Sequence, residues 1–416
     1  MHILIVSQYF WPENFRVNDL VVALEARGHE VSILTGQPNY PDGAVFPEFR
    51  NNPESFSKYG QAQIHRVPII PRGKGSAMLV LNYLSFCIIG SVMGPWKLRK
   101  VTFDAIFVFQ TSPITAAIPA IVLRAMRKRP MLMWVLDLWP DTLVSLGVVK
   151  SRIVLDLVDR MVGFIYARCD RILVQSRAFD SSIARYANSK SRIRYFPGWP
   201  EQVFTGLKNG HPPAPELEQF AKKFVVLFAG NIGESQDFPS IIEAAHLLRD
   251  RDEVIFAIVG DGRAASLMQE LVRQRQIEHK IVFLGRYPIE RMPSFFNAAQ
   301  ALLVSLRDEG SYRLTIPGKI QSYLSAGKPI LGMLNGEGAR VIEDAGAGIC
   351  CPAGDGKALA KSIEGLMEMP LEVRMAMAES GKAYCDIHFN RDTLVGSLEK
   401  WIGEVAKTNA DSEIAQ

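Results

Sequence analysis

The chain has 416 residues, which is enough for two domains of ordinary size, each with its own hydrophobic core. Its hydrophobic content of 48% and charged content of 22% are typical of a globular protein and exclude a low-complexity chain. The net charge is only +4, but residues 1–200 carry 24 Lys and Arg against 14 Asp and Glu, whereas the remaining 216 residues carry 23 against 29. The first half thus has a balance of +10 and the second of −6, which predicts an anionic partner for the first half.

This partner is not expected to be nucleic acid, because no nucleic-acid-binding motif accompanies the positive charge. An anionic membrane surface or a phosphorylated acceptor fits the charge better.

The five cysteines have no CxxC spacing, which indicates a reducing compartment and argues against a zinc site. The opening run MHILIVSQYF has no basic n-region and is too short for a signal peptide, so we expect a first β-strand there and a cytoplasmic protein.

Short apolar runs alternate with helical patterns along the chain. Continuous apolar strands of this kind indicate parallel sheets that are buried on both faces, so we predict an α/β fold with two doubly wound domains. Ligands are expected in a cleft at the carboxyl ends of the strands. The predicted strands are HILIVSQ, EVSILTG, AIFVFQ, LMWVLDL and RILVQS in the first domain, and FVVLFAG, VIFAIVG, KIVFLG, ALLVSL and PILGML in the second.

A stretch rich in Pro, Gly and charge around residues 203–222 interrupts this series of strands. Such composition is typical of an interdomain linker. We therefore expect a first domain over 1–204, a linker over 205–222 and a second domain over 223–385. The tail reads as helices, and its part at about 386–407 is expected to pack back on the first domain.

Residues 75–96 carry no charge over 22 positions, a length that could span a bilayer. The stretch lies inside an α/β domain, however, and Asn82, serines and glycines dilute it. Basic residues flank it on both sides, as in a helix that lies in a membrane interface: Arg72, Lys74, Lys97, Arg99 and Lys100. A buried core helix, an interfacial helix and a membrane-spanning helix all remain open.

Three turns of the second half have residues that suit a phosphate. The segments 230–233 (GNIG) and 260–263 (GDGR) each follow a predicted strand, where glycine lets the backbone approach a ligand. The segment 317–319 (PGK) places a lysine at a predicted helix N-terminus, whose unpaired N–H groups and dipole favour anions. Each glycine turn taken alone is also compatible with an ordinary strand-to-helix connection.

These motifs form an ordered set, GNIG…QD…IIEAA, VGDG, FLGR…FFNAAQALLVSL and PGK…YLSAGKPI, preceded in the first half by YFWPE, RGHEVSILTG, WVLDLWPD and CDRILVQS. Over nearly its whole length the chain resembles the retaining GT-B glycosyltransferases of family 4. It is most similar to a subgroup that includes N-acetyl-L-fucosamine transferases of bacterial O-antigen and capsule assembly. The resemblance implies two Rossmann-like domains that face a central cleft, with the acceptor bound by the first domain and the sugar nucleotide by the second.

The resemblance also implies the reaction. A sugar, expected to be an N-acetylated 6-deoxyhexose such as L-FucNAc, would pass with retention of configuration from a nucleotide diphosphate, expected to be UDP, to a lipid-linked oligosaccharide on undecaprenyl diphosphate. No cofactor and no metal are expected, and no Asp-x-Asp motif stands at a strand end. The protein would be peripheral on the inner face of the plasma membrane, held there by residues 75–100.

When the donor-binding residues of the family are carried over one by one, they correspond here to Gly230, Asn231, Gly233, Pro317, Gly318 and Lys319. Gly260 is expected in a neighbouring turn near the base. Lys319 would meet the diphosphate. Many family members carry two glutamates eight residues apart, and here those places hold Leu314 and Ser322. Ser322 is kept as a donor-site candidate.

Glu309 is the candidate for a replacement carboxylate, against the alternative of a solvated loop acid. An arginine and a lysine that many members have after the glycine loop are also missing, since Gln236 and Asp237 stand there. Neutralisation of the phosphates would fall on Lys319 and on nearby arginines: Arg307, Arg313 and Arg286.

In the first domain, Asp137 ends a predicted strand, so it is expected to position the acceptor or assist removal of its proton; a structural or helix-capping role is the alternative. The stretch from Pro12 to Arg16 replaces a glycine pair of typical members, and its Glu13 and Arg16 are expected to hold the acceptor phosphate or the transferred sugar unless they serve the loop alone. Two other functions stay open on this architecture. One is a UDP-sugar 2-epimerase, which would need no acceptor, and the other is a catalytically silent membrane-associated scaffold.

Overall fold

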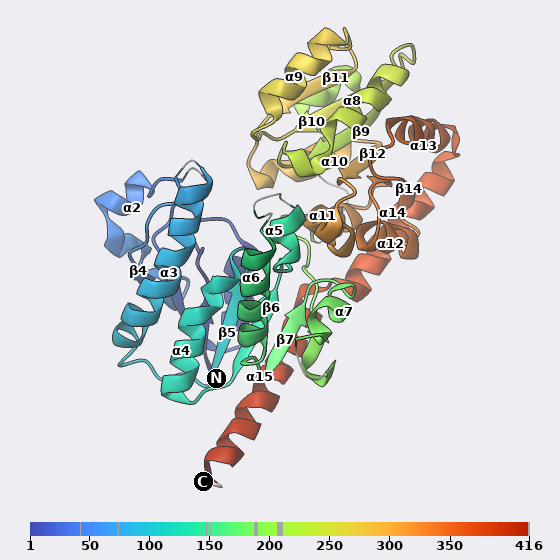
Figure 1. The fold of residues 1–416 in the computed structure, drawn as a ribbon. Helices are drawn as coiled ribbons and strands as arrows, with labels where there is room; N and C mark the ends of the chain where they lie inside the picture. The colour runs from blue at the N-terminus through green and yellow to red at the C-terminus, as the bar shows by residue number, and fades with distance from the viewer. Residues whose placement is uncertain are drawn as a thin grey trace. The chain divides into compact units, whose positions relative to one another are not determined.

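The computed structural model describes residues 1–41, 43–73, 75–145, 149, 151–186, 190–205 and 211–414. The chain forms two compact units (Figure 1). The first unit comprises Met1–Pro197 together with Asp392–Gln416, and the second comprises Gly198–Arg391. Each unit is an α/β layer structure built on a largely or wholly parallel sheet.

The first unit contains an eight-stranded sheet in the order β3-β4-β2-β1-β5-β6-β7-β8. All neighbouring strands are parallel except the short pair β3–β4. The central strands have buried side chains on both faces, which is why the sequence shows them as unbroken apolar runs. The strands are β1 (His2–Val6), β2 (Glu30–Gly36), β3 (Lys58–Tyr59), β4 (Ala62–Val67), β5 (Ala105–Gln110), β6 (Met131–Val135), β7 (Arg171–Val174) and β8 (Ile193–Tyr195).

Helices cover this sheet, and the chain reverses its direction of travel between β1 and β5. Such a reversal places the carboxyl ends of the two strands beside a natural ligand site. The helices of this unit are α1 (Arg16–Ala26), α2 (Pro47–Asn51), α3 (Ser76–Lys97), α4 (Ile118–Arg127), α5 (Asp141–Ser145), α6 (Arg152–Tyr166) and α7 (Phe179–Ala184), with 3-10 turns η1 (Pro53–Phe56), η2 (Ile114–Ala117) and η3 (Lys190–Arg192).

The C-terminal helix α15 (Arg391–Ile414) belongs to the first unit from Asp392 onward, so the part of the tail that packs on this unit begins later than the predicted residue 386. Arg27 donates a hydrogen bond of 3.0 Å to the carbonyl of Asp392. Glu399 lies 3.2 Å from the ring nitrogen of His29, and the rings of Trp401 and Phe196 are in edge contact.

The second unit contains a six-stranded parallel sheet in the order β11-β10-β9-β12-β13-β14. Its direction reverses between β9 and β12, so the carboxyl ends of those strands form the second natural ligand site. The strands are β9 (Phe224–Ala229), β10 (Val254–Val259), β11 (Ile281–Gly285), β12 (Ala301–Ser305), β13 (Ile330–Met333) and β14 (Gly348–Cys351).

Two apolar cores, one on each face of this sheet, hold the second unit together. The helices are α8 (Phe238–Leu247), α9 (Ala265–Gln274), α10 (Met292–Ala298), α11 (Gly318–Ala326), α12 (Glu337–Asp344), α13 (Gly356–Glu368) and α14 (Leu371–His388), and the 3-10 turns are η4 (Gln202–Phe204), η5 (Pro215–Phe220), η6 (Glu234–Gln236), η7 (Ile289–Arg291) and η8 (Gly310–Leu314).

The border between the units differs from the predicted linker at 205–222. It falls at Pro197, and residues 211–222 are part of the second unit. Phe204, Ala214 and Leu217 are buried in the second core, so a segment that its prolines and charges mark as a linker is anchored by three apolar side chains. Residues 206–210 lie outside the described residues.

Helix α3 has two different sides. Phe86 and Asn82 are fully buried, and Gly94 sits so close to β2 that a Cβ there would lie 2.9 Å from Leu34. The opposite side exposes Ile88 by 61% and Val92 by 71%. Among the described residues, Ala77–Lys97 is the one helix that is long and apolar enough to cross a membrane. Of its 18-residue apolar stretch, 28% is buried inside the protein. Its packed side belongs to the core, which does not fit a membrane-spanning placement. Lys74, one of the predicted basic flanks, lies outside the described residues.

Candidate functional site

The first turn of the second unit begins where β9 ends. Gly230 has φ +138°, a conformation that side chains other than glycine rarely adopt. A Cβ on Gly230 would lie 2.6 Å from Cε and 2.9 Å from Nζ of Lys319. The glycine is therefore needed because the lysine side chain passes directly over the backbone at this point. The motifs at 230–233 and 317–319, which lie about 90 residues apart in sequence, come together as expected.

Gly260 lies in the turn that neighbours residues 230–233, as predicted, while its nearness to the base stays a prediction. A Cβ on Gly260 would lie 1.8 Å from the carbonyl oxygen of Gly230, and one on Gly262 would lie 2.3 Å from that of Ile232. The backbone N–H of Ile232 also donates to the carbonyl of Asp261 at 2.9 Å. The turn at 260–262 thus packs directly against the turn at 230–233 and supports it.

Gly233 closes the first turn. A Cβ there would lie 2.6 Å from Nδ2 of Asn231, and its N–H donates to Oε1 of Gln236 at 3.2 Å. Asn231 is itself exposed at the tip of the turn. Gln236 therefore takes part in shaping the turn at the place where many family members carry a basic residue.

Lys319 is the most unusual charge in this unit. It lies in the first turn of α11, its Nζ stands 3.5 Å above the ring centre of Phe228, and it is only partly exposed. No hydrogen bond or ion pair joins its ammonium to any described residue. Burial lowers the pKa of Lys319 to about 7, because no carboxylate offsets the loss of water. The cation–π contact compensates only part of that loss.

Helix α11 is held firmly below this lysine. The hydroxyl of Tyr323 accepts a hydrogen bond of 3.0 Å from the N–H of Ala229, the last residue of β9, and its ring is almost fully buried. At the N-terminus of the helix, a Cβ on Gly318 would meet nothing within 4 Å. The first turn of α11 therefore presents open space, an unpaired cation and helix N-terminal amides together, which is an arrangement suited to an anion. Pro317 is the residue that precedes the first turn.

Ser322 does not offer a free hydroxyl. It is buried to 6% exposure and donates to Oε2 of Glu201 at 2.6 Å. Sequence reasoning missed Glu201, because it stands 121 residues away and no motif marks it. The place that many family members fill with a glutamate is thus filled here by a serine that contacts a carboxylate from another part of the chain.

The loop after β12 contains charges that are paired with one another. Arg313 forms a close ion pair with Asp308, and Arg307 lies 3.9 Å from Glu309. Both predicted site residues, Arg313 and Glu309, thus have local partners within their own loop. Arg286 is exposed just after the outermost strand, β11.

In the first unit, Glu13 is buried to 3% exposure, and backbone groups surround its carboxylate. Oε1 accepts hydrogen bonds from the N–H groups of Asn39 and Tyr40, at 2.8 and 2.7 Å, and Oε2 accepts one from Phe10 at 3.1 Å. Burial raises the pKa of Glu13 to about 7, although these hydrogen bonds act in the opposite direction. Glu13 therefore ties two loops together, which favours the alternative that it serves the loop over the prediction that its carboxylate holds a ligand. Arg16 is the first residue of α1.

Asp137 follows β6 at the carboxyl edge of the first sheet and is partly exposed. Its Oδ2 accepts hydrogen bonds from the N–H and the hydroxyl of Ser112, at 2.8 and 2.7 Å, and Trp139 donates to the same hydroxyl at 3.1 Å. Burial raises the pKa of Asp137, and the bonds from Ser112 partly oppose this rise. Asp137 is thus held in place by one oxygen at the expected edge of the sheet.

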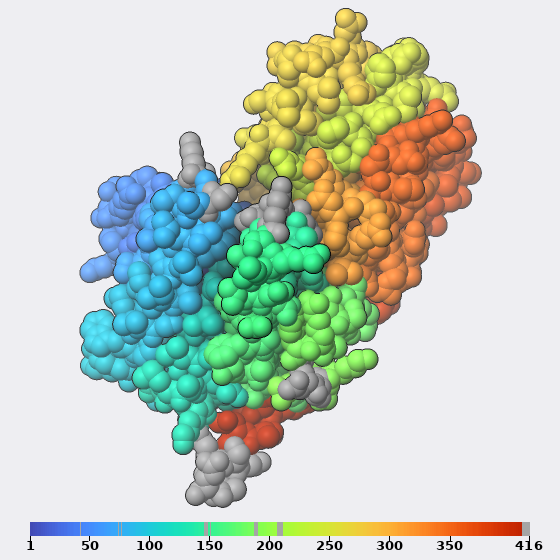
Figure 2. Space-filling model, viewed as in Figure 1, coloured from blue at the N-terminus to red at the C-terminus, as the bar shows by residue number. Residues whose placement is uncertain are grey.

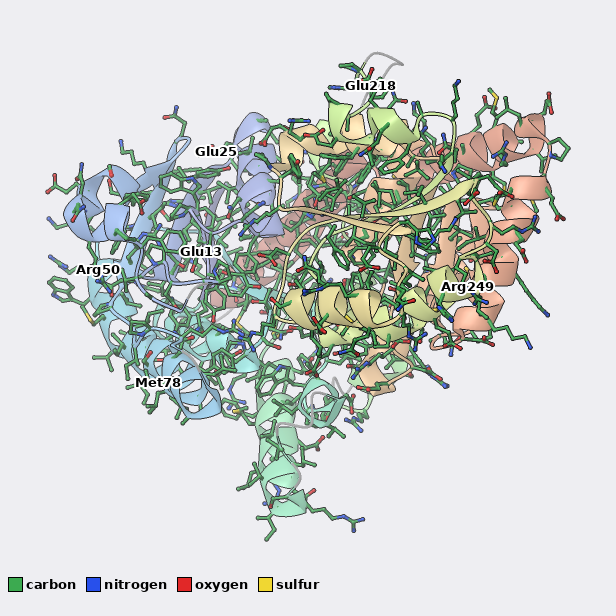
Figure 3. All side chains as sticks on the ribbon, turned by 90° about the horizontal axis from the view of Figure 1, so that it is seen from above. Glu13, Glu25, Arg50, Met78, Glu218 and Arg249 are labelled. Atoms are coloured by element: carbon green, nitrogen blue, oxygen red, sulfur yellow. The ribbon has the colours of Figure 1, made fainter. Side chains whose placement is uncertain are left out.

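Figure 3 shows the contrast between interior and surface in this unit: Glu13 lies among other side chains, while Met78 of α3 lies at the periphery.

No group of three or more His, Cys, Asp or Glu that could hold a metal occurs among the residues that the structure describes. The five cysteines are free thiols.

Comparison with known proteins accounts for both units. Residues 14–199 match the family model of glycosyl transferase 4-like domains, and residues 214–384 match that of glycosyl transferases group 1. The chain is 29% identical over 246 residues to a probable glycosyltransferase, WbjE of Pseudomonas aeruginosa, a match that covers 57% of this chain and 60% of that protein. It is 24% identical over 340 residues to WcaI of Escherichia coli, a putative colanic acid biosynthesis glycosyl transferase, covering 79% and 82%.

Solved structures show the same architecture. The crystal structure of Anabaena HepE in complex with UDP superposes with a TM-score of 0.71 at 15% identity, covering 97% of this chain and all of that one. That of WaaG, a glycosyltransferase involved in lipopolysaccharide biosynthesis, gives 0.66 at 14% identity and covers 97% and 99%. With a 4-like domain followed by a group 1 domain on this fold, the chain belongs to the GT-B glycosyltransferases.

Proposed function

We propose that the protein takes a sugar from a nucleotide diphosphate and transfers it during the synthesis of a polysaccharide or lipopolysaccharide. The observation that carries the proposal is Lys319, a cation without an ionic partner among the described residues, set against a glycine turn and a helix N-terminus. The names of WbjE, WcaI and WaaG support transfer. The HepE structures with UDP and UDP-glucose support a uridine nucleotide as the donor.

In the proposed reaction, the oxygen of an acceptor hydroxyl forms a bond to the anomeric carbon of the donor sugar. The bond from that carbon to the β-phosphate oxygen breaks, and the nucleoside diphosphate leaves with the electron pair. Protonated Lys319 and the amides of the first turn of α11 stabilise the negative charge that develops on the leaving group. The proposed reaction takes this stabilising charge from the protein and, as the family resemblance implies, uses no metal and no cofactor. Asp137 positions the acceptor hydroxyl and takes up its proton.

The finer parts of the proposal rest on the family resemblance. The donor is UDP-linked, its sugar is an N-acetylated 6-deoxyhexose such as L-FucNAc, and transfer proceeds with retention of configuration. The acceptor is an oligosaccharide on undecaprenyl diphosphate, of the kind used for O-antigen or capsule. The cationic first half of the chain suits such a diphosphate acceptor at a membrane.

A thermal-shift screen of the purified protein against UDP, GDP, ADP and their sugars tests the donor. A ligand at roughly 100 times its dissociation constant stabilises a fold by about 2.7 kcal/mol, so UDP should raise the melting temperature, and one UDP-sugar should raise it further. An acceptor-dependent release of UDP would separate transfer from 2-epimerisation, which needs no acceptor. Binding without any turnover would point to a silent scaffold instead, and a lack of response to all nucleotides would contradict the proposal.

The proposal also places the protein on the inner face of the plasma membrane, with the exposed side of α3 in the interface. Charge reversal at the basic end of α3 (Lys97, Arg99 and Lys100 to Glu) should release the protein from anionic vesicles. Reversal of three exposed lysines of the second unit (Lys222, Lys357 and Lys382) is the matched control, and it should leave vesicle binding nearly unchanged. Equal sedimentation of the two variants would contradict membrane docking through α3.

A further inference from the structure

Helix α6 has an apolar stripe that faces solvent. Ile153 is 74% exposed, Leu157 is 58% exposed and Phe164 is 45% exposed, and their spacing of four and seven residues puts them on one side of the helix. None of the residues from Arg152 to Met161 is buried. Isolated exposed apolar residues are ordinary, but a continuous stripe along three turns indicates a surface that something covers.

The charges beside this stripe are mainly basic. Arg160 lies on the stripe itself, and the guanidinium of Arg168 stands 3.3 Å above the ring of Phe164. Of the two acidic residues of α6, Asp159 is paired with Arg185 in its own unit, at 3.5 Å. Asp156 is exposed at the border of the stripe. An apolar strip bordered by arginines is typical of a helix that lies at a lipid surface.

Helices α3 and α6 cover the same face of the first sheet, with α4 as another member of that layer (Figures 1 and 2). On α3, every fourth residue from Val80 to Trp96 is an exposed apolar side chain. The segment that includes α3 and α4, residues 72–129, contains nine Lys and Arg but a single acidic residue, Asp104. The two apolar stripes thus lie in a helical layer whose segment 72–129 carries a strong excess of basic residues, of which Arg124 is paired with Asp170.

We infer that α6 is a second membrane-contacting element, and that the stripe of α6 and the exposed side of α3 dock together on an anionic lipid bilayer. The inference rests on the proposed membrane association of α3 and extends it to a helix that the basic flanks of residues 75–96 do not mark. Both helices begin at the carboxyl edge of the first sheet, where Asp137 lies. Docking through both fixes that edge relative to the bilayer, so that the head group of a lipid-linked acceptor can reach it.

A bilayer fits this face better than a second copy of the chain. In a symmetric dimer the same face would meet itself, and its excess of basic residues would then repel. An anionic surface attracts those residues and accepts the apolar side chains between them. The charge of the face therefore selects the lipid surface as the occupant.

The test compares two neutral double variants of the full chain in flotation with phosphatidylglycerol vesicles and with phosphatidylcholine vesicles. Ile153→Gln/Leu157→Gln removes the stripe of α6 without changing the net charge. Leu267→Gln/Leu371→Gln is the matched control in the second unit, where the two leucines are 66% and 59% exposed. We expect the α6 variant to bind phosphatidylglycerol vesicles about tenfold more weakly than the parent protein and the control variant to bind like it. The parent protein should bind phosphatidylcholine vesicles more weakly than phosphatidylglycerol vesicles.

Equal vesicle binding by the α6 variant and the parent protein would overturn the inference, and so would a dimer in solution that the α6 variant dissociates while vesicle binding is unchanged. The thermal response to UDP is measured on the same samples, because the candidate donor site lies in the second unit, away from α6 in the sequence. If UDP has no effect on any sample but the α6 variant loses the vesicles, the proposed reaction fails and the docking surface stands. If UDP stabilises all samples equally and vesicle binding is unchanged in the α6 variant, only the inference about α6 fails.

Discussion

Glu13 in the first unit is buried and Lys319 in the second is partly buried, and the surroundings of these two charges are opposite. Three backbone N–H groups donate to the carboxylate of Glu13, whereas no described residue accepts from the ammonium of Lys319. A buried charge whose hydrogen bonds are complete stabilises the loops that surround it, and a desolvated charge without a partner costs stability unless a ligand supplies the missing contact. The comparison separates a structural acid from a binding-site cation more clearly than residue type or motif position does.

The largest effect is expected from removing the ammonium of Lys319. Lys319→Ala should lower turnover on the order of 10²–10³, by analogy with the loss of one oxyanion-hole donor, because the leaving diphosphate loses its cation. Lys357→Ala is the control, since that lysine is exposed on α13 and belongs to no predicted site. Steady-state release of the nucleoside diphosphate measures both variants. Near-normal turnover by the Lys319 variant would remove it from the site.

Truncation of Glu13 should act on stability instead. Glu13→Ala leaves the N–H groups of Phe10, Asn39 and Tyr40 without their acceptor, which should lower the free energy of unfolding by about 3 kcal/mol. The exposed Glu48 provides the matched control, and Glu48→Ala should change it by less than about 0.5 kcal/mol. Denaturant titration gives both values. A stable Glu13→Ala protein that had lost acceptor binding would reverse our assignment of this residue.

A methyl group at Gly230 tests the contact that positions the lysine. Gly230→Ala should weaken UDP binding roughly tenfold, because its Cβ would displace Cε and Nζ of Lys319. Gly285→Ala serves as the control: it has the same class of backbone strain, with φ +79°, but its Cβ would meet nothing within 4 Å. Calorimetric titration with UDP compares the two. Equal affinities would show that the placement of Lys319 does not matter.

The lowered pKa of Lys319 predicts that UDP binding takes up a proton. At pH 8 the lysine of the free protein, with a pKa of about 7, is mostly neutral, whereas the bound diphosphate favours its charged form. Binding at pH 8 should therefore take up about one proton, and binding at pH 6 almost none. Titrations in buffers of different ionisation enthalpy measure the uptake. The account would be contradicted if Lys319→Met took up as many protons as the parent protein.

The smallest effect concerns the protein without ligand. The pKa of Lys319 is about 7 in the folded state and 10.5 in the unfolded chain. Between these two pH values the folded state therefore binds fewer protons than the unfolded chain. The free energy of unfolding should therefore rise with pH over this window, and the unfavourable contribution of the buried charge should be fully present below about pH 7. Lys319→Met should raise the melting temperature at pH 6 by a few degrees. A lower melting temperature would mean that the ammonium has a partner in the free protein.

Much of the fold could be predicted from the sequence. All ten predicted strands are present, because buried parallel strands appear as unbroken apolar runs. Strand β4 was missed because Gln63, His65 and Arg66 interrupt its apolar residues, and β14 because its four residues Gly348–Cys351 include a glycine and two cysteines instead of an apolar run. The border between the units was misplaced because buried Ala214 and Leu217 lie among prolines and charges.

The candidate site was predictable only in part. The glycine turn and Lys319 carry local patterns, and the structure brings them together. Contacts that depend on tertiary structure leave no such pattern: the bond from Ser322 to Glu201 and the enclosure of Glu13 by backbone groups from residues 39 and 40 appear only in the fold. Partners within a loop, such as Asp308 for Arg313, are likewise invisible when residues are weighed one at a time.

The central claim is that Lys319 meets the diphosphate of the donor, and the most direct measurement compares UDP with uridine. Calorimetric titrations of both ligands into the parent protein and into Lys319→Met at pH 7 give four affinities. We predict that the substitution weakens UDP binding at least tenfold, roughly the value of one charge-assisted contact, and leaves uridine binding unchanged. Equal losses for UDP and uridine, or no loss for either, would contradict the claim.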